Sequence, residues 1–507
     1  MNKSAHFFSF VTFIFYFVTL IALQVPTYPK DLCMAYLEPK KVALLIAVLA
    51  AFLTPFDLSA VNIALPTISS EFSMDAVSLG WVATAYLLAS AVFLVPFGRI
   101  ADIYGRKKIF SLGLIIFTTA SLFMVFSMSS AMIISLRVVQ GMGGALIFGT
   151  AVAILTSVTP PNERGKALGI YTTAVYLGLS MGPFIGGFLT STFGWRSIFL
   201  INVPIGILVL VIIRTQLVGE WADARGESFD LSGAILYGLA LVSVMYGFSR
   251  LPDTAGLVLV ISGTVFIIGF IWWENRTPQP LLNLSLFLKN RVFAFSNLAA
   301  LINYCASFSV TFFLSFYLQY IRGLTPVAAG TILVIQPVVQ AVFSSYAGKL
   351  SDRIEPGKIA SVGMGMTSCG LILLSFLSVD TPYAYLIGTL VLLGLGFAFF
   401  SSPNTNAIMS SVKKHEYGVA SGILGTMRLV GQMLSMGIAM VIISFFIGRV
   451  MITPDVADEL LMSIHAGFVI FAIICCCGIF FSLVRGKIRE DPPNPMSEES
   501  DTITIPC

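Results

Sequence analysis

Two ionisable residues, Asp57 and Arg137, lie inside long apolar stretches of the sequence. An ionisable side chain at the centre of a bilayer costs roughly 2.5–3.5 kcal/mol on insertion scales, so it normally faces a cavity or a partner. Desolvation disfavours the ionised carboxyl of Asp57, whereas a nearby cation favours it. We therefore predict that Asp57 carries a proton or binds a cationic group. The alternative is a structural hydrogen bond at a helix break near Pro55.

The guanidinium of Arg137 stays charged and offers five donors, so it is a suitable partner for a buried carboxylate. If it faces Asp57 or a shared cavity, it sets the affinity of that carboxyl group for protons. The alternative is a side chain that extends to the membrane interface. Further polar residues within apolar segments are predicted either to line a substrate path or to bond neighbouring helices; they are Asn62, Gln140, Asn303, Gln336, Gln340, Asn404 and Arg428.

The composition places these residues in a membrane. Of the 507 residues, 57% are hydrophobic and only 11% are charged, whereas a soluble domain usually carries about 25% charged residues. The apolar residues form blocks long enough for helices of about 20 residues to cross a bilayer. They do not alternate over the segments of about 10 residues that a barrel strand needs. We therefore predict an all-α polytopic membrane protein.

Hydropathy predicts fourteen transmembrane helices after residue 40. A separate hydrophobic stretch at residues 7–23 is predicted to be an additional helix, an uncleaved anchor, or a segment upstream of a true start at Met34. The fourteen helices are expected near residues 42–66, 79–98, 109–127, 131–157, 167–190, 196–214, 231–249, 254–273, 292–321, 328–347, 359–378, 382–410, 419–447 and 463–484.

The distribution of Lys and Arg predicts how these helices are oriented. When both ends of the fourteen-helix block are placed on the cytoplasmic side of the cell membrane, most of the 29 basic residues fall on that side. One missed helix would destroy this asymmetry, so it supports both the helix count and the orientation. The basic residues that remain in outer loops are Arg196, Arg250, Arg322 and Arg449.

Other classes of function find little support in the sequence. The basic residues are spread over many loops, so we expect no nucleic-acid surface. The cysteines show no metal-ligand spacing with histidine, so we expect neither a metal nor a cofactor. The sequence has no nucleophile elbow and no phosphate-binding loop. We therefore predict that the protein is not an enzyme and that it acts as a monomer in the lipid bilayer.

Matching segments about 250 residues apart indicate an internal duplication. Segments 98–108 and 348–358 share the spacing Gly-x-x-x-Asp, and segments 163–169 and 416–422 match at nearly the same offset. Parallel repeats of this kind build transporters whose substrate site lies between the two halves. The predicted parts are a hydrophobic extension (1–39), a six-helix bundle (40–215), two inserted helices (216–290), a second six-helix bundle (291–485) and a disordered cytoplasmic tail (486–507).

Several motifs resemble those of one membrane-protein family. The loop after the second span resembles the signature of the major facilitator superfamily, carried by Gly98, Asp102, Gly105, Arg106 and Lys107. The fifth span resembles the Gly-Pro motif of its antiporter branch, carried by Gly178, Gly182, Pro183, Gly186 and Gly187. Segments 57–66, 136–144 and 195–204 resemble motifs of the fourteen-helix drug–proton antiporters, although Leu58-Ser59 departs from the usual pattern.

The resemblance implies a major-facilitator fold that exports a small organic compound in exchange for protons. It implies that Asp57 and Arg137 couple transport to protons, and that the Asp102 loop is a cytoplasmic gate which caps a helix of the other half. The glycines of the fifth span would close one side of the cavity. A lipophilic cation or an amphiphile is the expected substrate. The alternatives are a proton-coupled importer of a metabolite and a receptor that transports nothing.

Overall fold

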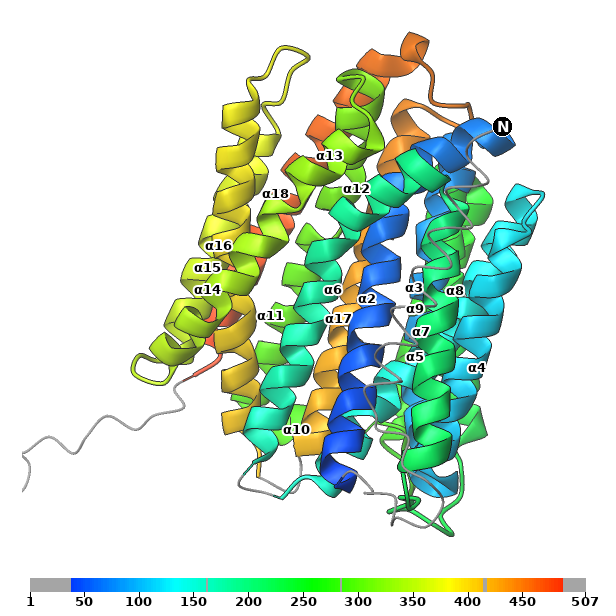
Figure 1. Cartoon of the computed structure of the whole chain (residues 1–507). Helices are drawn as coiled ribbons and strands as arrows, with labels where there is room; N and C mark the ends of the chain where they lie inside the picture. Colours follow the sequence, from blue (N-terminus) through cyan, green and yellow to red (C-terminus); the bar gives the residue numbers. More distant parts are fainter. Residues whose placement is uncertain (1–37, 161–162, 283–284, 414–416, 487–507) are drawn as a thin grey trace, which may run out of the picture.

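The chain forms one bundle of helices that run up and down past each other (Figure 1). The computed structural model describes residues 38–160, 163–282, 285–413 and 417–486, and these contain helices and turns but no strand. The predicted count of fourteen is confirmed, because fourteen described segments are long and apolar enough to cross a membrane. The hydrophobic stretch at 7–23 and the tail after 486 lie outside the described residues.

The first eight described helices, α2 to α9, each correspond to one span, and a short helix, α10, lies in the connection that follows them. Their bounds are α2 (Pro39–Phe72), α3 (Ala76–Tyr104), α4 (Arg106–Val125), α5 (Ser130–Val158), α6 (Arg164–Phe193), α7 (Arg196–Gln216), α8 (Leu231–Arg250), α9 (Thr254–Glu274) and the short α10 (Ser285–Lys289). The later helices are α11 (Arg291–Ser307), α12 (Ser309–Phe316), α13 (Pro326–Leu333), α14 (Ile335–Ser351), α15 (Pro356–Leu374), α16 (Tyr383–Ser410), α17 (Tyr417–Phe446) and α18 (Ala457–Val484).

Two predicted spans are not single helices. The span predicted at 292–321 consists of α11, α12 and a π-helical turn at Tyr317–Ile321. At the first break, the amide of Ser309 donates to Ser435 Oγ (3.1 Å) on α17. The span predicted at 328–347 is divided into α13 and α14 at Val334, because Pro337 has no amide hydrogen for the carbonyl of Leu333.

Local capping explains where several helices begin and end. Asp75 caps α3 by accepting hydrogen bonds from the amides of Val77 and Ser78, each at 3.0 Å. The same helix ends at Gly105, whose φ of +123° is rarely adopted by any residue with a side chain. This glycine lets the chain reverse directly from α3 into α4.

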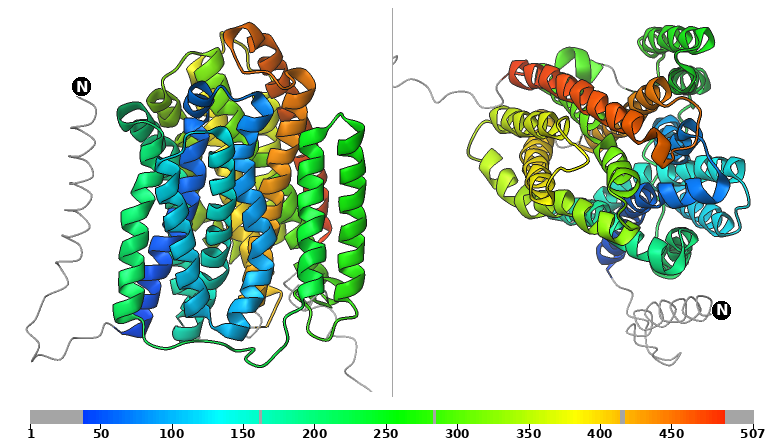
Figure 2. Two further views of the ribbon diagram at one scale, coloured as in Figure 1. Left: turned by 90° about the vertical axis from the view of Figure 1, so that its right-hand side faces the viewer. Right: turned by 90° about the horizontal axis from the view of Figure 1, so that it is seen from above.

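The helices pack as two groups with a pair at the side. Helices α2 to α7 pack mainly on one another, and α11 to α18 form the second group; the groups meet where α3 contacts α17 and where α6 contacts α13 and α14. Helices α8 and α9 pack on each other and stand at the edge of the bundle beside α3 and α17 (Figure 2). This arrangement is the predicted one of two bundles with two inserted helices. The residue boundaries predicted for the parts stay a prediction.

The groups are joined at one end of the bundle, which we call the Met74 end after the turn between α2 and α3. There, Ser315 Oγ donates to the carbonyl of Asn62 (2.9 Å), and Gln319 Nε2 donates to the carbonyl of Ile63 (3.1 Å). The amide of Ala76 also donates to the carbonyl of Val450 (2.9 Å). These bonds cross between the groups, so the Met74 end is closed.

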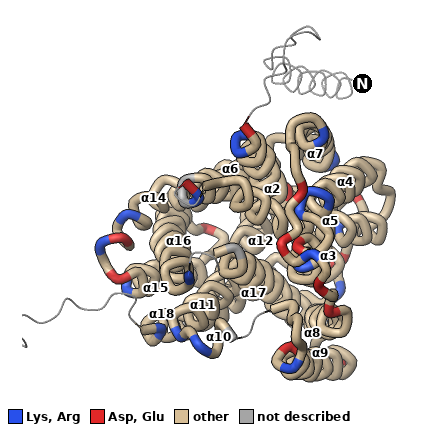
Figure 3. Tube along the Cα trace, turned by 90° about the horizontal axis from the view of Figure 1, so that it is seen from below, with Lys and Arg blue, Asp and Glu red and all other residues tan. Residues whose placement is uncertain are grey.

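The opposite end, which we call the Gly105 end, carries most of the described basic residues. Viewed from this end, positions of Lys and Arg lie around the rim of the bundle together with positions of Asp and Glu (Figure 3). The first and last helices of the block, α2 and α18, begin and end there respectively. The helices thus alternate as predicted, with both ends of the block on one face. That this face is cytoplasmic stays a prediction.

Candidate functional site

The carboxyl group of Asp57 lies inside the first group of helices, where it meets Arg137. Nη1 of Arg137 is 2.6 Å from Oδ2 of Asp57, and both side chains are 0% exposed. The other carboxylate oxygen accepts hydrogen bonds from Gln140 Nε2 (3.1 Å) and Asn202 Nδ2 (2.7 Å). Both oxygens of the carboxylate are therefore satisfied by donors from other helices.

Besides its contact with α2, Arg137 is fixed by contacts with α3 and with Gln140 of its own helix, α5. Its Nε donates to the carbonyl of Val82 (2.9 Å) on α3, and its guanidinium lies 4.4 Å from the ring centroid of Tyr86 on the same helix. Nη1 also donates to Gln140 Oε1 (2.6 Å), one turn along α5. A cation with these contacts can stay ionised away from water.

The glycine stripe of α6 brings that helix against the turn of α2 that carries Asp57. A Cβ atom on Gly186 would lie 2.8 Å from Cα of Ala60, and one on Gly182 would overlap the hydroxyl of Ser59. Gly178 packs in the same way on the carbonyl of Phe52. Only glycine permits this approach, so the stripe sets the distance between α2 and α6.

The other two residues of the predicted antiporter motif face the second group of helices. A Cβ atom on Gly187 would overlap the carbonyl of Pro326, and the carbonyl of Pro183 occupies the space beside Gly330 of α13. The Gly-Pro motif therefore forms part of the contact between the groups at the Met74 end. Its role in preventing leak stays a prediction.

At the Gly105 end, the predicted gate residues bind the connection between α7 and α8. Arg106 contacts Asp102 (2.7 Å) and Asp223 (2.8 Å), and its Nη1 donates to Ser157 Oγ (2.7 Å). The amide of Lys107 donates to Glu220 Oε1 (2.8 Å), and its ammonium group donates to the carbonyl of Leu217. Segment 217–230 thus covers the loop, which the sequence did not indicate.

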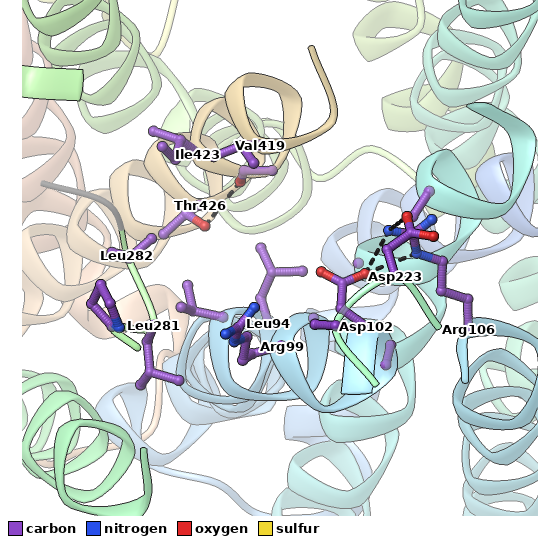
Figure 4. A pocket seen from close by; sticks show the side chains of 18 of the residues that line it. Leu94, Arg99, Asp102, Arg106, Asp223, Leu281, Leu282, Val419, Ile423 and Thr426 are labelled. Carbon is purple, nitrogen blue, oxygen red and sulfur yellow. Dashed lines mark hydrogen bonds and ion pairs between the residues drawn. The ribbon is translucent and has the colours of Figure 1, made fainter. Parts of the chain in front are cut away.

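A cavity of about 1030 Å³ separates the groups next to this loop. Asp102 and Arg106 lie on the side of the first group, while Val419, Ile423 and Thr426 of α17 lie across the opening (Figure 4). Gly98 lines the same cavity. The carboxylate of Asp102 binds Arg106 and does not reach the end of α17 in this open form, so the predicted capping contact stays a prediction for a closed form.

The remaining predicted cavity residues fall into different surroundings. Asn404 is engaged on both sides, since its Nδ2 donates to the carbonyl of Ser296 (3.0 Å) and its Oδ1 accepts from Arg485 Nη1 (2.9 Å). Asn303 is 0% exposed, and neither polar atom of its side chain has a hydrogen-bond partner. Asn62 Oδ1 is likewise buried without a partner. Gln336 and Arg428 are partly exposed, whereas Gln340 is 7% exposed.

Arg485 was not predicted as more than a basic residue after the last span, yet it is 1% exposed. Its guanidinium donates to Ser296 Oγ (3.1 Å), to the carbonyl of Gly357 (3.2 Å) and to Ser482 Oγ (2.7 Å). Burial lowers the pKa of Arg485 to about 10, against an opposing effect of the charge on Glu355. The side chain still carries its charge at neutral pH and connects α11, α15, α16 and α18.

Asn202 is a neighbour of Asp57 that sequence reasoning did not assign to the site. It belongs to segment 195–204, whose resemblance to an antiporter motif was noted, but its bond to Asp57 spans 145 positions. No spacing rule connects residues so far apart. Among the described residues, no three His, Cys, Asp or Glu side chains are grouped so that they could hold a metal ion.

The geometry defines a class of protein: a multi-span membrane protein whose two helical groups enclose a cavity and whose first group holds a buried ion pair, an arrangement that fits carriers which alternate between two openings. The sequence model of the Major Facilitator Superfamily matches residues 47–436. The chain therefore belongs to this superfamily, as its motifs indicated.

Curated relatives are transporters and resistance proteins of bacteria. The riboflavin transporter RibZ of Clostridioides difficile is 32% identical and covers 77% of this chain and 86% of its own. The tetracenomycin C resistance and export protein of Streptomyces glaucescens is 31% identical and covers 81% of this chain and 77% of its own. The puromycin resistance protein pur8 of Streptomyces alboniger is 32% identical, and the match covers 80% of this chain and 81% of its own.

A solved structure shares the fold. It is a bacterial homolog of the human lysosomal transporter Spinster in an inward-facing, unoccupied conformation. The TM-score is 0.65 with 17% sequence identity, and the match covers 88% of this chain and 97% of the solved chain. At this identity the likeness concerns the arrangement of helices and not the substrate.

Proposed function

We propose that this protein exports small organic compounds from the cytoplasm in exchange for protons. The observation that carries the proposal is the enclosed pair of Asp57 and Arg137, which has no route to water in the open form because both side chains are 0% exposed. A carboxyl group held in this way fits a proton carrier, and the relatives named as resistance and export proteins support the direction.

In the proposed cycle, the proton binds to an oxygen of Asp57. The neutral carboxyl group no longer attracts Arg137, whose charge keeps the carbonyl of Val82, the amide oxygen of Gln140 and the ring of Tyr86 as partners. Asp57 and Arg137 belong to α2 and α5, so loss of their attraction changes the packing of the first group. Protonation of Asp57 is thereby coupled to the packing of the helices that border the cavity.

The Gly105 end is proposed to be the cytoplasmic mouth, in agreement with its basic residues. The cavity lies at this end while the Met74 end is closed by bonds between the groups. Closing the mouth would bring the start of α17 to the Asp102 loop. There the carboxylate of Asp102 would interact favourably with the free backbone amides at the N-terminus of that helix. A substrate bound in the cavity would then be released at the opposite side.

Everted membrane vesicles containing the protein test this proposal. With the lumen acidified, we expect tetracenomycin C or riboflavin to accumulate inside the vesicles, because outward proton flow drives the substrate inward. Vesicles carrying Asp57→Asn should not accumulate it. If the compounds instead leave the lumen together with protons, the protein is an importer and the proposed direction is wrong.

A further inference from the structure

Arg428 of α17 lies between the two groups of helices, in aromatic surroundings. Its guanidinium is 5.1 Å from the ring centroid of Tyr304 on α11 and 6.0 Å from that of Tyr176 on α6. Tyr176 belongs to the first group and Tyr304 to the second, so the cation reaches across the interface where the groups must separate and approach. All three side chains are partly exposed, which leaves them accessible from the interior.

This cation has no carboxylate to neutralise it among the described residues. The ion pairs of the described chain do not include Arg428, and the charged or polar groups that act on it are the tyrosines 171, 176 and 304. Arg137, by contrast, has Asp57 at 2.6 Å. An unneutralised cation within a membrane-spanning helix normally faces a water-filled path or a ligand.

A tyrosine hydroxyl without a hydrogen-bond partner lies near Arg428. The hydroxyl of Tyr171 on α6 has no hydrogen-bond partner, and the side chain is only 5% exposed. Leu168, one turn before Tyr171 on the same helix, lines the cavity at the Gly105 end. Tyr171 and Arg428 do not line that cavity themselves, but each lies within one turn of a residue that does, Leu168 and Thr426, and the hydroxyl of Tyr171 is a donor without an acceptor.

We propose that Arg428, together with Tyr171, Tyr176 and Tyr304, binds a planar aromatic substrate that carries a carboxylate or phenolate at the edge of its ring system. The tyrosine rings offer stacking surfaces, and the guanidinium offers donors in a plane that matches a carboxylate or phenolate. This inference rests on the proposed function, since it names the substrate class that the proposed exporter would carry. It differs from the lipophilic cation or amphiphile that the sequence analysis gave as the expected substrate.

The charge of the site argues against a cationic substrate. Asp57, the residue expected to attract a cation, is enclosed and already paired. Any cation entering between Tyr176 and Tyr304 would meet the like charge of Arg428 at contact distance, in surroundings that screen charge poorly. An aromatic anion gains from the same field.

The test uses two dyes with the same xanthene ring and opposite charge. Purified protein in lipid nanodiscs is titrated with fluorescein at mildly alkaline pH, where it is anionic, and with the cation tetramethylrhodamine methyl ester, with fluorescence anisotropy as the readout. We expect the wild type to bind fluorescein at least about tenfold more tightly than the cation, because one charge-assisted contact decides between them.

The variants Arg428→Met and Tyr171→Phe should lose most of the affinity for fluorescein, and Arg428→Lys should keep part of it. Arg250→Met is the matched control: this partly exposed arginine also lies against a tyrosine ring, 5.4 Å from that of Tyr246, but at the end of α8. It should bind both dyes as the wild type does. Thermal melting of each variant shows whether the fold is intact.

Equal or tighter binding of the cation by the wild type would overturn the inference, as would full fluorescein affinity in Arg428→Met. Vesicle transport separates this outcome from a failure of the proposed function. If the cation is exported against a proton gradient and fluorescein is not bound, exchange stands and the anion site is wrong. If fluorescein binding depends on Arg428 but no compound moves with the gradient, the anion site stands and proton exchange is wrong.

Discussion

Oδ2 of Asp57 and Nη1 of Arg137 lie 2.6 Å apart in a place that solvent does not reach. Desolvating two charges is expensive, and their attraction compensates for it only when the remaining donors and acceptors are also satisfied. Gln140 and Asn202 satisfy the second carboxylate oxygen here, whereas Nη2 of Arg137 is buried without a hydrogen-bond partner. The pair is therefore stable only as long as both charges are present, which makes it sensitive to a proton.

Replacing Asp57 by Asn should destabilise the protein as well as stop transport. The substitution leaves Arg137 buried without a counter-charge, which typically costs about 3–5 kcal/mol. We expect a clearly lower melting temperature in detergent, and a partial recovery when Arg137→Gln is added. The double variant should remain inactive in everted vesicles.

Asp380→Asn serves as the control for the loss of a carboxylate, because Asp380 is exposed in the turn before α16. Its melting temperature and transport should match those of the wild type. If Asp57→Asn transports at the wild-type rate under a proton gradient, the pair is a structural feature and takes no part in coupling.

Gly186→Ala should weaken the contact of α6 with α2. The added Cβ atom would lie 2.8 Å from Cα and Cβ of Ala60. These atoms cannot move away by a change of side-chain rotamer. Overpacking of this kind costs about 1–3 kcal/mol. The yield of folded protein and its melting temperature report the effect.

Gly169 provides the matched control on the same helix, because nothing lies within 4 Å of a Cβ atom placed on it. Gly169→Ala should be neutral or stabilising by up to about 1 kcal/mol, since alanine favours a helix over glycine. A similar loss of stability in both variants would show that the stripe does not act through close packing.

The spans and the two central charges were predictable because each depends on local information. Hydropathy locates a helix by its own residues, and the cost of a charge in lipid marks Asp57 and Arg137 without knowledge of their partners. Contacts between distant segments were not predictable. Asn404 was predicted either to line a substrate path or to bond a neighbouring helix; it binds Arg485, and no pattern within either helix identifies that partner.

The irregular elements escaped prediction for a related reason. The break before α12 accompanies a bond from the amide of Ser309 to Ser435, which lies 126 positions later on another helix. Segment 217–230 reads as an ordinary polar connection, yet Asp223 and Glu220 bind the gate loop. In both places tertiary contacts decide the local structure, and these exist only in the folded chain.

Arg485→Gln should loosen the second group of helices at the Gly105 end. The guanidinium holds Ser296, Gly357 and Asn404 from three different helices, and hydrogen bonds to a charged group contribute about 1.5–3 kcal/mol each. We expect a loss of at least about 2 kcal/mol, measured as a lower melting temperature. Arg353→Gln, at an exposed arginine before α15, should change stability by less than about 0.5 kcal/mol.

The two carboxylates that bind Arg106 should contribute unequally to the gate. The Asp223 side chain is 72% exposed and that of Asp102 is 35% exposed, so water screens the first contact more strongly. An exposed ion pair contributes about 0.2–1 kcal/mol. Asp223→Asn should therefore change the rate of transport only a few-fold, and added salt should reduce the difference from the wild type.

Asp102→Asn should have the larger effect, because it removes both the partner of Arg106 and the charge proposed to meet the start of α17 when the mouth closes. We expect the transport rate in vesicles to fall by at least about tenfold, with little response to salt, while the melting temperature stays close to that of Asp223→Asn. A carboxylate that only holds Arg106 in place would predict a different result: both variants would slow transport alike, and in both the loss would diminish as salt is added.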